Sequence, residues 1–161
     1  MTLMQRVIAR LLAPLAILAA IGVGASSLAL ADSGSPTATT ARAVTVQLRH
    51  GSLGRYLVDA RGRTLYLFEK DQPNQSACSG ACAAAWPVDP SSGTPKAGSG
   101  VKASLLGTIT RGDGSTQVTY NRHPLYYFAR DSGPGQQSGQ GIDAFGAKWF
   151  VVTPAGSAAG A

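Results

Sequence analysis

The chain has 161 residues, enough for one modest domain, and its 14 Lys and Arg against 8 Asp and Glu give a net charge of +6. The basic residues are scattered and never form a run of about five or six, a pattern that argues against a nucleic-acid-binding protein. We therefore expect no nucleic acid among its partners.

Residues 1–31 have the composition of a secretory signal peptide. Arg6 and Arg10 are their only charges, residues 11–31 are uncharged, and the segment ends in a small-x-small tripeptide at Ala31. An uncleaved membrane anchor is the alternative, because about 20 apolar residues can span a bilayer. Proline and glycine within the uncharged stretch favour cleavage, so we predict an exported protein.

The folded part is expected to be residues 44–154. Residues 32–43 are rich in Ser, Thr, Ala and Pro and contain no large apolar side chain, and residues 155–161 are similarly small. Such segments cannot bury enough surface to offset their ordering entropy. We predict a flexible linker at 32–43 and a disordered tail at 155–161.

Runs of β-branched, aromatic and leucine residues between turn residues predict strands. The pentapeptide 59–63 separates two of these runs and predicts a first hairpin, and residues 121–123 separate two others and predict a second. Asp113-Gly114 indicates a further tight turn. The expected strands are 44–48, 53–58, 64–68, 105–109, 116–120, 124–128 and 148–153.

One aromatic strand motif occurs twice. Thr64–Asp71 (TLYLFEKD) matches Pro124–Asp131 (PLYYFARD) in register, and a tryptophan follows each copy, Trp86 in the first and Trp149 in the second. We interpret each copy as a β-hairpin followed by a loop and a Trp in the structural core. The recurring motif residues are Tyr66, Phe68, Asp71, Tyr126, Phe128 and Asp131.

The motif strands are apolar on both faces. Side chains alternate across a strand, so Tyr66 and Phe68 share one face and Leu65 and Leu67 share the other. Strands of this kind are covered on both sides, as in the middle of a sandwich or a closed sheet.

The predicted fold is therefore all-β and mainly antiparallel. Two related β-hairpin repeats, at about residues 53–88 and 115–154, would form one compact sandwich or closed sheet. One short helical turn is expected near the cysteines, at residues 79–85.

Cys78 and Cys82 are the two cysteines, and export favours a disulfide between them that pins the loop leading to Trp86. A dithiol oxidoreductase is an alternative, although three residues separate the cysteines instead of the usual two. A zinc site that adds His50 and His123 lacks a standard spacing. Haem attachment is not supported, because alanine follows the second cysteine. We expect no metal and no cofactor.

Asp71 and Asp131 are expected to be structural, because an Asp that leaves a strand can accept backbone N–H groups of the next loop. The alternative is a shared cleft in which the two carboxylates bind a cation or act as acid and base. His123 lies at a turn without a motif-linked nucleophile, so no catalytic residue is predicted. The Tyr and Trp rings are expected in the core, with a sugar- or quinone-stacking platform as the alternative.

Several motifs occur together along the chain. They are the Y-x-F-x-x-D strands, the C-x-x-x-C before Ala84–Pro87, the Arg111–Gly114 turn and the closing Phe145–Trp149 segment. The combination resembles the bacterial family "secreted repeat of unknown function", also described as predicted lipoproteins with a Yx(F/W/Y)xxD motif. The resemblance covers about residues 53–154 and implies an envelope or extracellular location, but no activity.

Two departures from the family pattern matter. No cysteine lies near the predicted cleavage site, so we expect no lipid anchor. Arg122 stands where the family usually has glycine, so the second hairpin turn is expected to differ from the common form.

The sequence thus predicts an exported cell-envelope or extracellular protein that acts as a non-enzymatic binding or scaffold module. The alternative is an envelope redox or metal-handling protein that uses Cys78 and Cys82, or Asp71 and Asp131. We expect a monomer, and the sequence indicates no partner beyond a component of the cell envelope.

Overall fold

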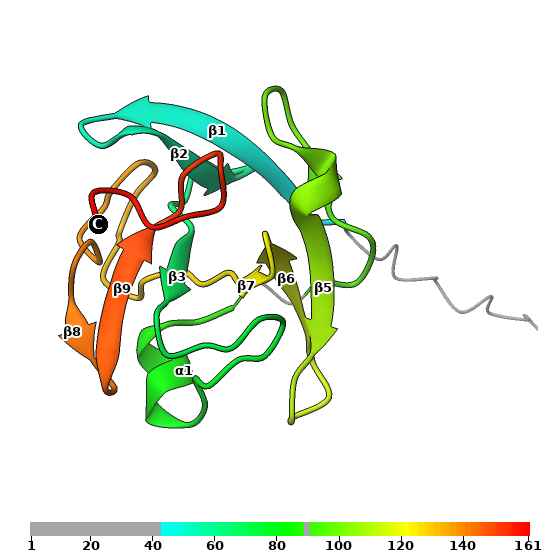
Figure 1. Ribbon diagram of the computed structural model, residues 1–161, viewed down its shortest axis with the longest axis vertical. Helices are drawn as coiled ribbons and strands as arrows, with labels where there is room; N and C mark the ends of the chain where they lie inside the picture. Colours follow the sequence, from blue (N-terminus) through cyan, green and yellow to red (C-terminus); the bar gives the residue numbers. More distant parts are fainter. Residues whose placement is uncertain (1–42, 89–90) are drawn as a thin grey trace, which may run out of the picture. The chain divides into compact units, whose positions relative to one another are not determined.

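The computed structural model describes residues 43–88 and 91–161 (Figure 1). The expected signal peptide, at residues 1–31, and all but the last residue of the expected linker lie outside the described residues. Within the described part of the chain, no helix is both long enough and apolar enough to cross a membrane.

Short strands dominate the described chain, and its α-helix has five residues. In chain order the elements are β1 (Thr45–Gly51), β2 (Gly54–Asp59), β3 (Tyr66–Phe68), α1 (Ala81–Ala85), β4 (Lys96–Ala97), a 3-10 turn η1 (Ala103–Leu105), β5 (Leu106–Thr110), β6 (Thr116–Tyr120), β7 (His123–Pro124), β8 (Asp143–Ala144) and β9 (Ala147–Val151).

These strands form three three-stranded sheets, in the orders β2-β1-β4, β3-β9-β8 and β5-β6-β7. All pairs are antiparallel except β1 with β4. The predicted all-β, mainly antiparallel fold with one short helix near the cysteines is therefore confirmed. The sheets are not closed, so the closed-sheet arrangement is wrong.

The first hairpin differs from the expected one. β2 pairs along its whole length with β1 across a two-residue turn, at which Gly54 has a φ of 80°. Toward β3 it makes one bridge, between Val58 and Thr64. The pairing stops there because the N–H of Leu57 donates to the carbonyl of Val152, and the carbonyl of Leu65 accepts the N–H of Val152.

The hairpins of the second repeat follow the predicted turns. β5 pairs with β6 across the Arg111–Ser115 turn, and β6 pairs with β7 across Asn121 and Arg122. Both residues of the second turn have left-handed φ values, 49° and 67°, as a two-residue hairpin of type I′ requires. Arg122 therefore occupies a backbone conformation that favours glycine.

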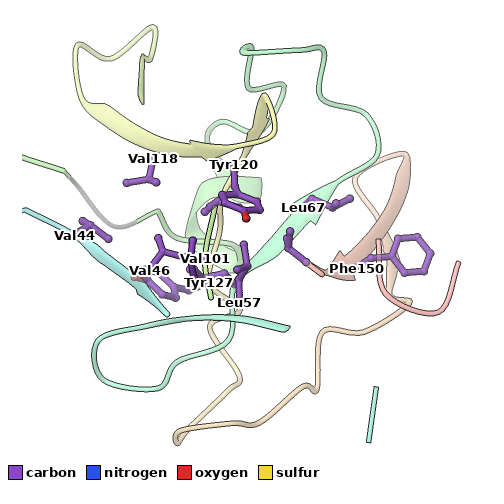
Figure 2. Packing of buried hydrophobic residues seen from close by; sticks show 12 residues of the cluster. Val44, Val46, Leu57, Leu67, Val101, Val118, Tyr120, Tyr127 and Phe150 are labelled. Atoms are coloured by element: carbon purple, nitrogen blue, oxygen red, sulfur yellow. The ribbon is translucent and has the colours of Figure 1, made fainter. Parts of the chain in front are cut away.

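Two apolar clusters flank the motif strands, as the alternation predicts. One cluster contains Leu65, Leu67 and Tyr127, and Figure 2 shows members of it that come from β1, β2, β3, β6 and β9. The other contains Tyr66 and Phe68 with both tryptophans. Both faces of each motif strand are therefore buried, and the hydrophobic effect acts on both sides of it.

Residues 155–161, for which the composition predicts a disordered tail, fold back against the end of β9. Val152 bridges to Ala158, and the N–H of Ala159 donates to the carbonyl of Val151. Gly156, with a φ of 78°, makes the turn that sends the segment back along β9. The small side chains that suggested disorder allow this close approach, and Ala159 is buried.

Candidate functional site

The two copies of the motif lie against each other at their tyrosines, where β3 meets the chain after β7 (Figure 1). The N–H of Tyr66 donates to the carbonyl of Tyr126 over 2.9 Å, and the N–H of Tyr126 donates back over 3.0 Å. An antiparallel pair of this kind relates the two copies by an approximate twofold axis.

Each motif strand pairs with the tryptophan segment of the other repeat. β3 of the first repeat pairs with β9 of the second, and the N–H of Glu69 donates to the carbonyl of Lys148 over 3.0 Å. At the equivalent place the N–H of Ala129 donates to the carbonyl of Ala85, also over 3.0 Å. The two repeats are therefore interlocked, because each copy of the motif pairs with the tryptophan segment of the other copy.

The tyrosine and aspartate side chains of the motif also meet across the repeats. The hydroxyl of Tyr66 donates to Oδ2 of Asp131 over 2.6 Å, and the hydroxyl of Tyr126 donates to Oδ2 of Asp71 over 2.7 Å. Both are short charge-assisted hydrogen bonds. We call these four residues the Tyr–Asp clamp.

The second oxygen of each carboxylate orders the loop that follows it. Oδ1 of Asp71 accepts the N–H of Ala77 over 2.7 Å, and Oδ1 of Asp131 accepts the N–H of Ser138 over 3.0 Å. This is the structural role that the sequence suggested for the two aspartates. Their partnership with the tyrosines is additional, because single-strand patterns do not show which distant side chains meet.

The pKa shifts of the residues in the Tyr–Asp clamp favour a structural role over proton transfer. Burial, and then the neighbouring Asp131, raises the pKa of Tyr66 far above its ordinary value. Burial also raises the pKa of Tyr126, which faces Asp71. Burial raises the pKa of Asp71, although the N–H of Ala77 and the hydroxyl of Tyr126 oppose the shift. The tyrosines are thus neutral donors at physiological pH.

Four aromatic rings form a continuous stack beside the clamp. Trp86 and Trp149 lie 3.9 Å apart with an angle of 2° between their planes. Phe68 stacks on the outer face of Trp149 at 4.0 Å, and Phe128 stacks on Trp86 at 4.4 Å. The stack alternates between the repeats, and all four rings are at least nine-tenths buried. Their burial supports a core role over an exposed stacking platform.

Cys78 and Cys82 lie at disulfide distance, with sulfur atoms 1.94 Å apart and Cα atoms 5.2 Å apart. Helix α1 begins between them, after Gly80, so the bond bridges the start of the helix instead of lying within it. The carbonyl of Cys82 accepts the N–H of Trp86 over 2.8 Å. The bond therefore fixes the segment that delivers one ring of the aromatic stack.

The histidines do not join the cysteines in a metal site. His50 is exposed on β1, and His123 is half-buried on β7, where burial and then Arg122 lower its pKa. Among residues 43–88 and 91–161, no three or more His, Cys, Asp or Glu side chains are grouped closely enough to hold a metal ion.

A cleft of about 520 Å³ lies between the disulfide loop and the β5–β6 turn. At its edge is Arg111, whose side chain is only 6% exposed. Nη1 of Arg111 donates to Oγ of Ser76 and Oε1 of Gln117, and Nη2 donates to the carbonyl of Cys78. Ser76 in turn bonds the hydroxyl of Tyr126, so the cleft is connected to the Tyr–Asp clamp.

The sequence pattern does not indicate that Arg111 is buried. Arg111 stands in an Arg-Gly-Asp-Gly segment that a hairpin turn explains fully, and its partners Ser76 and Gln117 lie 35 and 6 residues away. Gln117 in strand β6 is the one available signal, because a polar group buried in a strand needs a partner.

Comparison with family models matches residues 48–88 and 107–153 to a family described as "secreted repeat of unknown function". The two matched stretches contain the two motif copies and together cover more than half of the chain. Comparison with curated proteins and with solved structures finds no significant match. By the family match, the motifs and the interlocked repeats, the chain belongs to the family of secreted repeats of unknown function.

Proposed function

We propose that this protein is a non-enzymatic module that binds or scaffolds a component of the cell envelope or the extracellular space. The family description as secreted supports such a location. The proposal includes export through cleavage of residues 1–31, the absence of a lipid anchor, and action as a monomer. The binding or scaffold role is proposed for the folded repeats that remain after this cleavage.

The observation that carries the proposal is the engagement of the motif side chains with each other. Both aspartates of the Tyr–Asp clamp accept one tyrosine hydroxyl and one backbone N–H. A catalytic acid–base pair needs side chains that can reach a substrate and exchange protons with it. In the clamp the same groups tie two repeats together, which is the role expected of a rigid scaffold.

The cysteines support the same reading. Cys78 is 1% exposed and Cys82 is 6% exposed, and their sulfur atoms are at bonding distance. A redox-active pair is instead accessible to solvent and has one reactive thiolate in its reduced form. The alternative of a redox or metal-handling protein therefore receives less support than the binding or scaffold role.

Thiol titration of the purified protein tests the non-enzymatic assignment. We expect no reaction with a thiol reagent in the native state, and two reactive thiols after denaturation and reduction. Two fast-reacting thiols in the native protein after mild reduction, with the fold retained, would instead support redox work by Cys78 and Cys82.

Sedimentation with isolated cell envelopes tests the binding part. The purified mature protein is expected to co-sediment with envelopes of the source organism in a saturable manner, and heat-denatured protein is expected to lose this behaviour. A native protein that stays in the supernatant at every envelope concentration, together with inaccessible thiols, would overturn the envelope-binding role.

A further inference from the structure

The guanidinium of Arg111 is a buried cation whose hydrogen-bond partners are all neutral. Nη1 lies 2.8 Å from Oγ of Ser76 and 2.5 Å from Oε1 of Gln117, and Nη2 donates to the carbonyl of Cys78. Nε has no hydrogen-bond partner in the described part of the chain, although it is buried. A buried donor on a charged group that lacks a partner is costly, so an acceptor is expected there.

Asp113 is the nearest carboxylate, but it does not supply that acceptor. Its Oδ2 lies 3.9 Å from Nε of Arg111, beyond hydrogen-bond distance, and its side chain is 66% exposed. Its Oδ1 accepts both the N–H and the hydroxyl of Ser115, at 2.9 Å and 2.6 Å. The β5–β6 turn therefore holds Asp113 at the mouth of the cleft instead of against the arginine.

The cleft beside this arginine has the size and lining of a site for a small polar ligand. Its volume of about 520 Å³ falls within the usual range for ligand pockets. Most of its side chains are hydroxyls, amides or charged groups, with few apolar side chains. They include Asn74, Gln75, Ser76, Ser79, Arg111 and Asp113.

The arrangement of the N–H donors of Arg111 indicates which class of ligand the cleft can bind. The N–H of Nε and one N–H of Nη2 lie on the same edge of a guanidinium, and that edge matches two oxygens of a carboxylate or a phosphate. We propose that this cleft binds a small oxyanion group, a carboxylate or a phosphate monoester, through the Nε edge of Arg111 when the exposed side chain of Asp113 moves aside.

This inference names a ligand class for the binding role proposed above and rests on it. The ligand and Asp113 carry the same charge and compete for one cation, so Asp113 sets the affinity. The serine and amide side chains of the lining offer further hydrogen bonds to the rest of the ligand. The neighbouring link from Ser76 to Tyr126 would transmit occupancy to the Tyr–Asp clamp.

Amide NMR titrations of the purified mature protein test the site. The probes are inorganic phosphate and acetate, each compared with chloride at matched ionic strength. We expect saturable shifts at the amides of Ser76, Cys78 and Gly112 with at least one oxyanion, and no saturable shift with chloride. Tighter phosphate binding would assign a phosphate group to the natural ligand, and tighter acetate binding would assign a carboxylate.

Variants make the outcome decisive. Asp113→Asn removes the competing charge and is expected to tighten oxyanion binding about threefold to tenfold. Asp143→Asn, an equal charge change at an exposed position of β8, is expected to leave the affinity unchanged. Arg111→Lys keeps the positive charge but loses the two parallel N–H donors of the guanidinium, so we expect no saturable shift with either oxyanion. If Arg111→Lys does not fold, the affinity of Asp113→Asn alone tests the proposal.

The proposal is overturned if neither oxyanion gives saturable shifts, if the shifts map to the arginines of β1 and β2 instead, or if Asp113→Asn binds no tighter than the unmodified protein. Envelope sedimentation separates this failure from failure of the binding role. If co-sedimentation persists while no oxyanion binds, the module still binds an envelope component and only the oxyanion site is lost.

Discussion

The hydroxyl of Tyr66 lies 2.6 Å from Oδ2 of Asp131, a residue that belongs to the other repeat. Tyr126 makes the same contact with Asp71 at 2.7 Å. The tyrosine hydroxyl of each copy therefore bonds to the aspartate of the other copy, and the tyrosine and aspartate within one copy do not bond to each other.

Removal of one tyrosine hydroxyl from the Tyr–Asp clamp is expected to destabilise the folded protein. Tyr66→Phe leaves Oδ2 of Asp131 without its donor, and we expect a loss of about 1–3 kcal/mol in the free energy of unfolding. Tyr56→Phe is the matched control, because the Tyr56 hydroxyl makes only a 3.4 Å bond to the carbonyl of Gly135. Urea denaturation of both variants measures the difference.

A double-mutant cycle shows whether the loss belongs to the pair. Tyr66→Phe combined with Asp131→Asn is expected to cost less than the two single losses added together, because either one already breaks the bond. Strict additivity of the two losses would show that the 2.6 Å contact contributes no coupling energy.

The stability of the fold should depend on pH through Asp71. Burial raises its folded pKa above the ordinary value of 3.8, so in the interval between the two values the folded state binds more protons than the unfolded state. The free energy of unfolding then falls as the pH rises through that interval. Relative to Asp71→Asn, the unmodified protein is expected to gain stability as the pH is lowered from about 7 to about 4.

Asp113 is the control, because its contribution to the free energy of unfolding is expected to change with pH in the opposite direction. Hydrogen bonds from Ser115 lower its pKa, so its contribution to stability is lost as the pH falls through the lowered value. Relative to Asp113→Asn, the unmodified protein should therefore lose stability on acidification. Denaturation curves at a series of pH values compare the two variants, and equal slopes would contradict the assignment for Asp71.

Gly139 is required by the aromatic stack. A Cβ at this position would lie 2.8 Å from Cη2 of Trp86 and 2.9 Å from Cε1 of Tyr66, both ring atoms in a packed core. Gly139→Ala is expected to cost about 1–3 kcal/mol and to change the near-ultraviolet circular dichroism of the tryptophans. Gly133→Ala, where a Cβ meets no described atom within 4 Å, should have little effect on either measurement.

Arg122 is a position at which the protein can be stabilised. Its φ of 67° is unfavourable for a residue with a Cβ and suits glycine. Arg122→Gly is expected to raise the free energy of unfolding by about 0.5–1 kcal/mol, after the extra backbone entropy of glycine is taken into account. It should also raise the pKa of His123, on which Arg122 acts electrostatically.

Thermal denaturation and an NMR titration of the imidazole measure the two effects. Arg130→Gly is the control, because this exposed arginine lacks a positive φ and glycine relieves no strain there. A destabilised Arg122→Gly variant would mean that the arginine side chain makes a contact worth more than the backbone strain.

The sequence was sufficient for the local structure of the motif and insufficient for its pairing. Alternation of Tyr66 and Phe68 with Leu65 and Leu67 predicts two buried faces, and the structure has both. Periodicity is a property of one strand, however, and it does not specify which tryptophan segment lies alongside. Pairing within a repeat and pairing across repeats satisfy the same pattern, so the interlocking could not be predicted.

The burial of Arg111 beside the cleft could not be predicted, for a related reason. Arg111 is long and charged, and such residues are usually exposed. Its burial depends on acceptors from the disulfide loop and from β6, which come together only in the folded chain. Local turn chemistry predicted its backbone correctly and gave no information about where the side chain lies.

The crossed pairing of the two repeats also limits how such proteins can be assembled. A lone copy of this unit would leave one phenol, one carboxylate and one tryptophan segment without their counterparts, all at positions that a second identical molecule can fill. A polypeptide with a single unit is therefore expected to exist as a symmetric homodimer, and joining two units in one gene removes the dependence of folding on protein concentration.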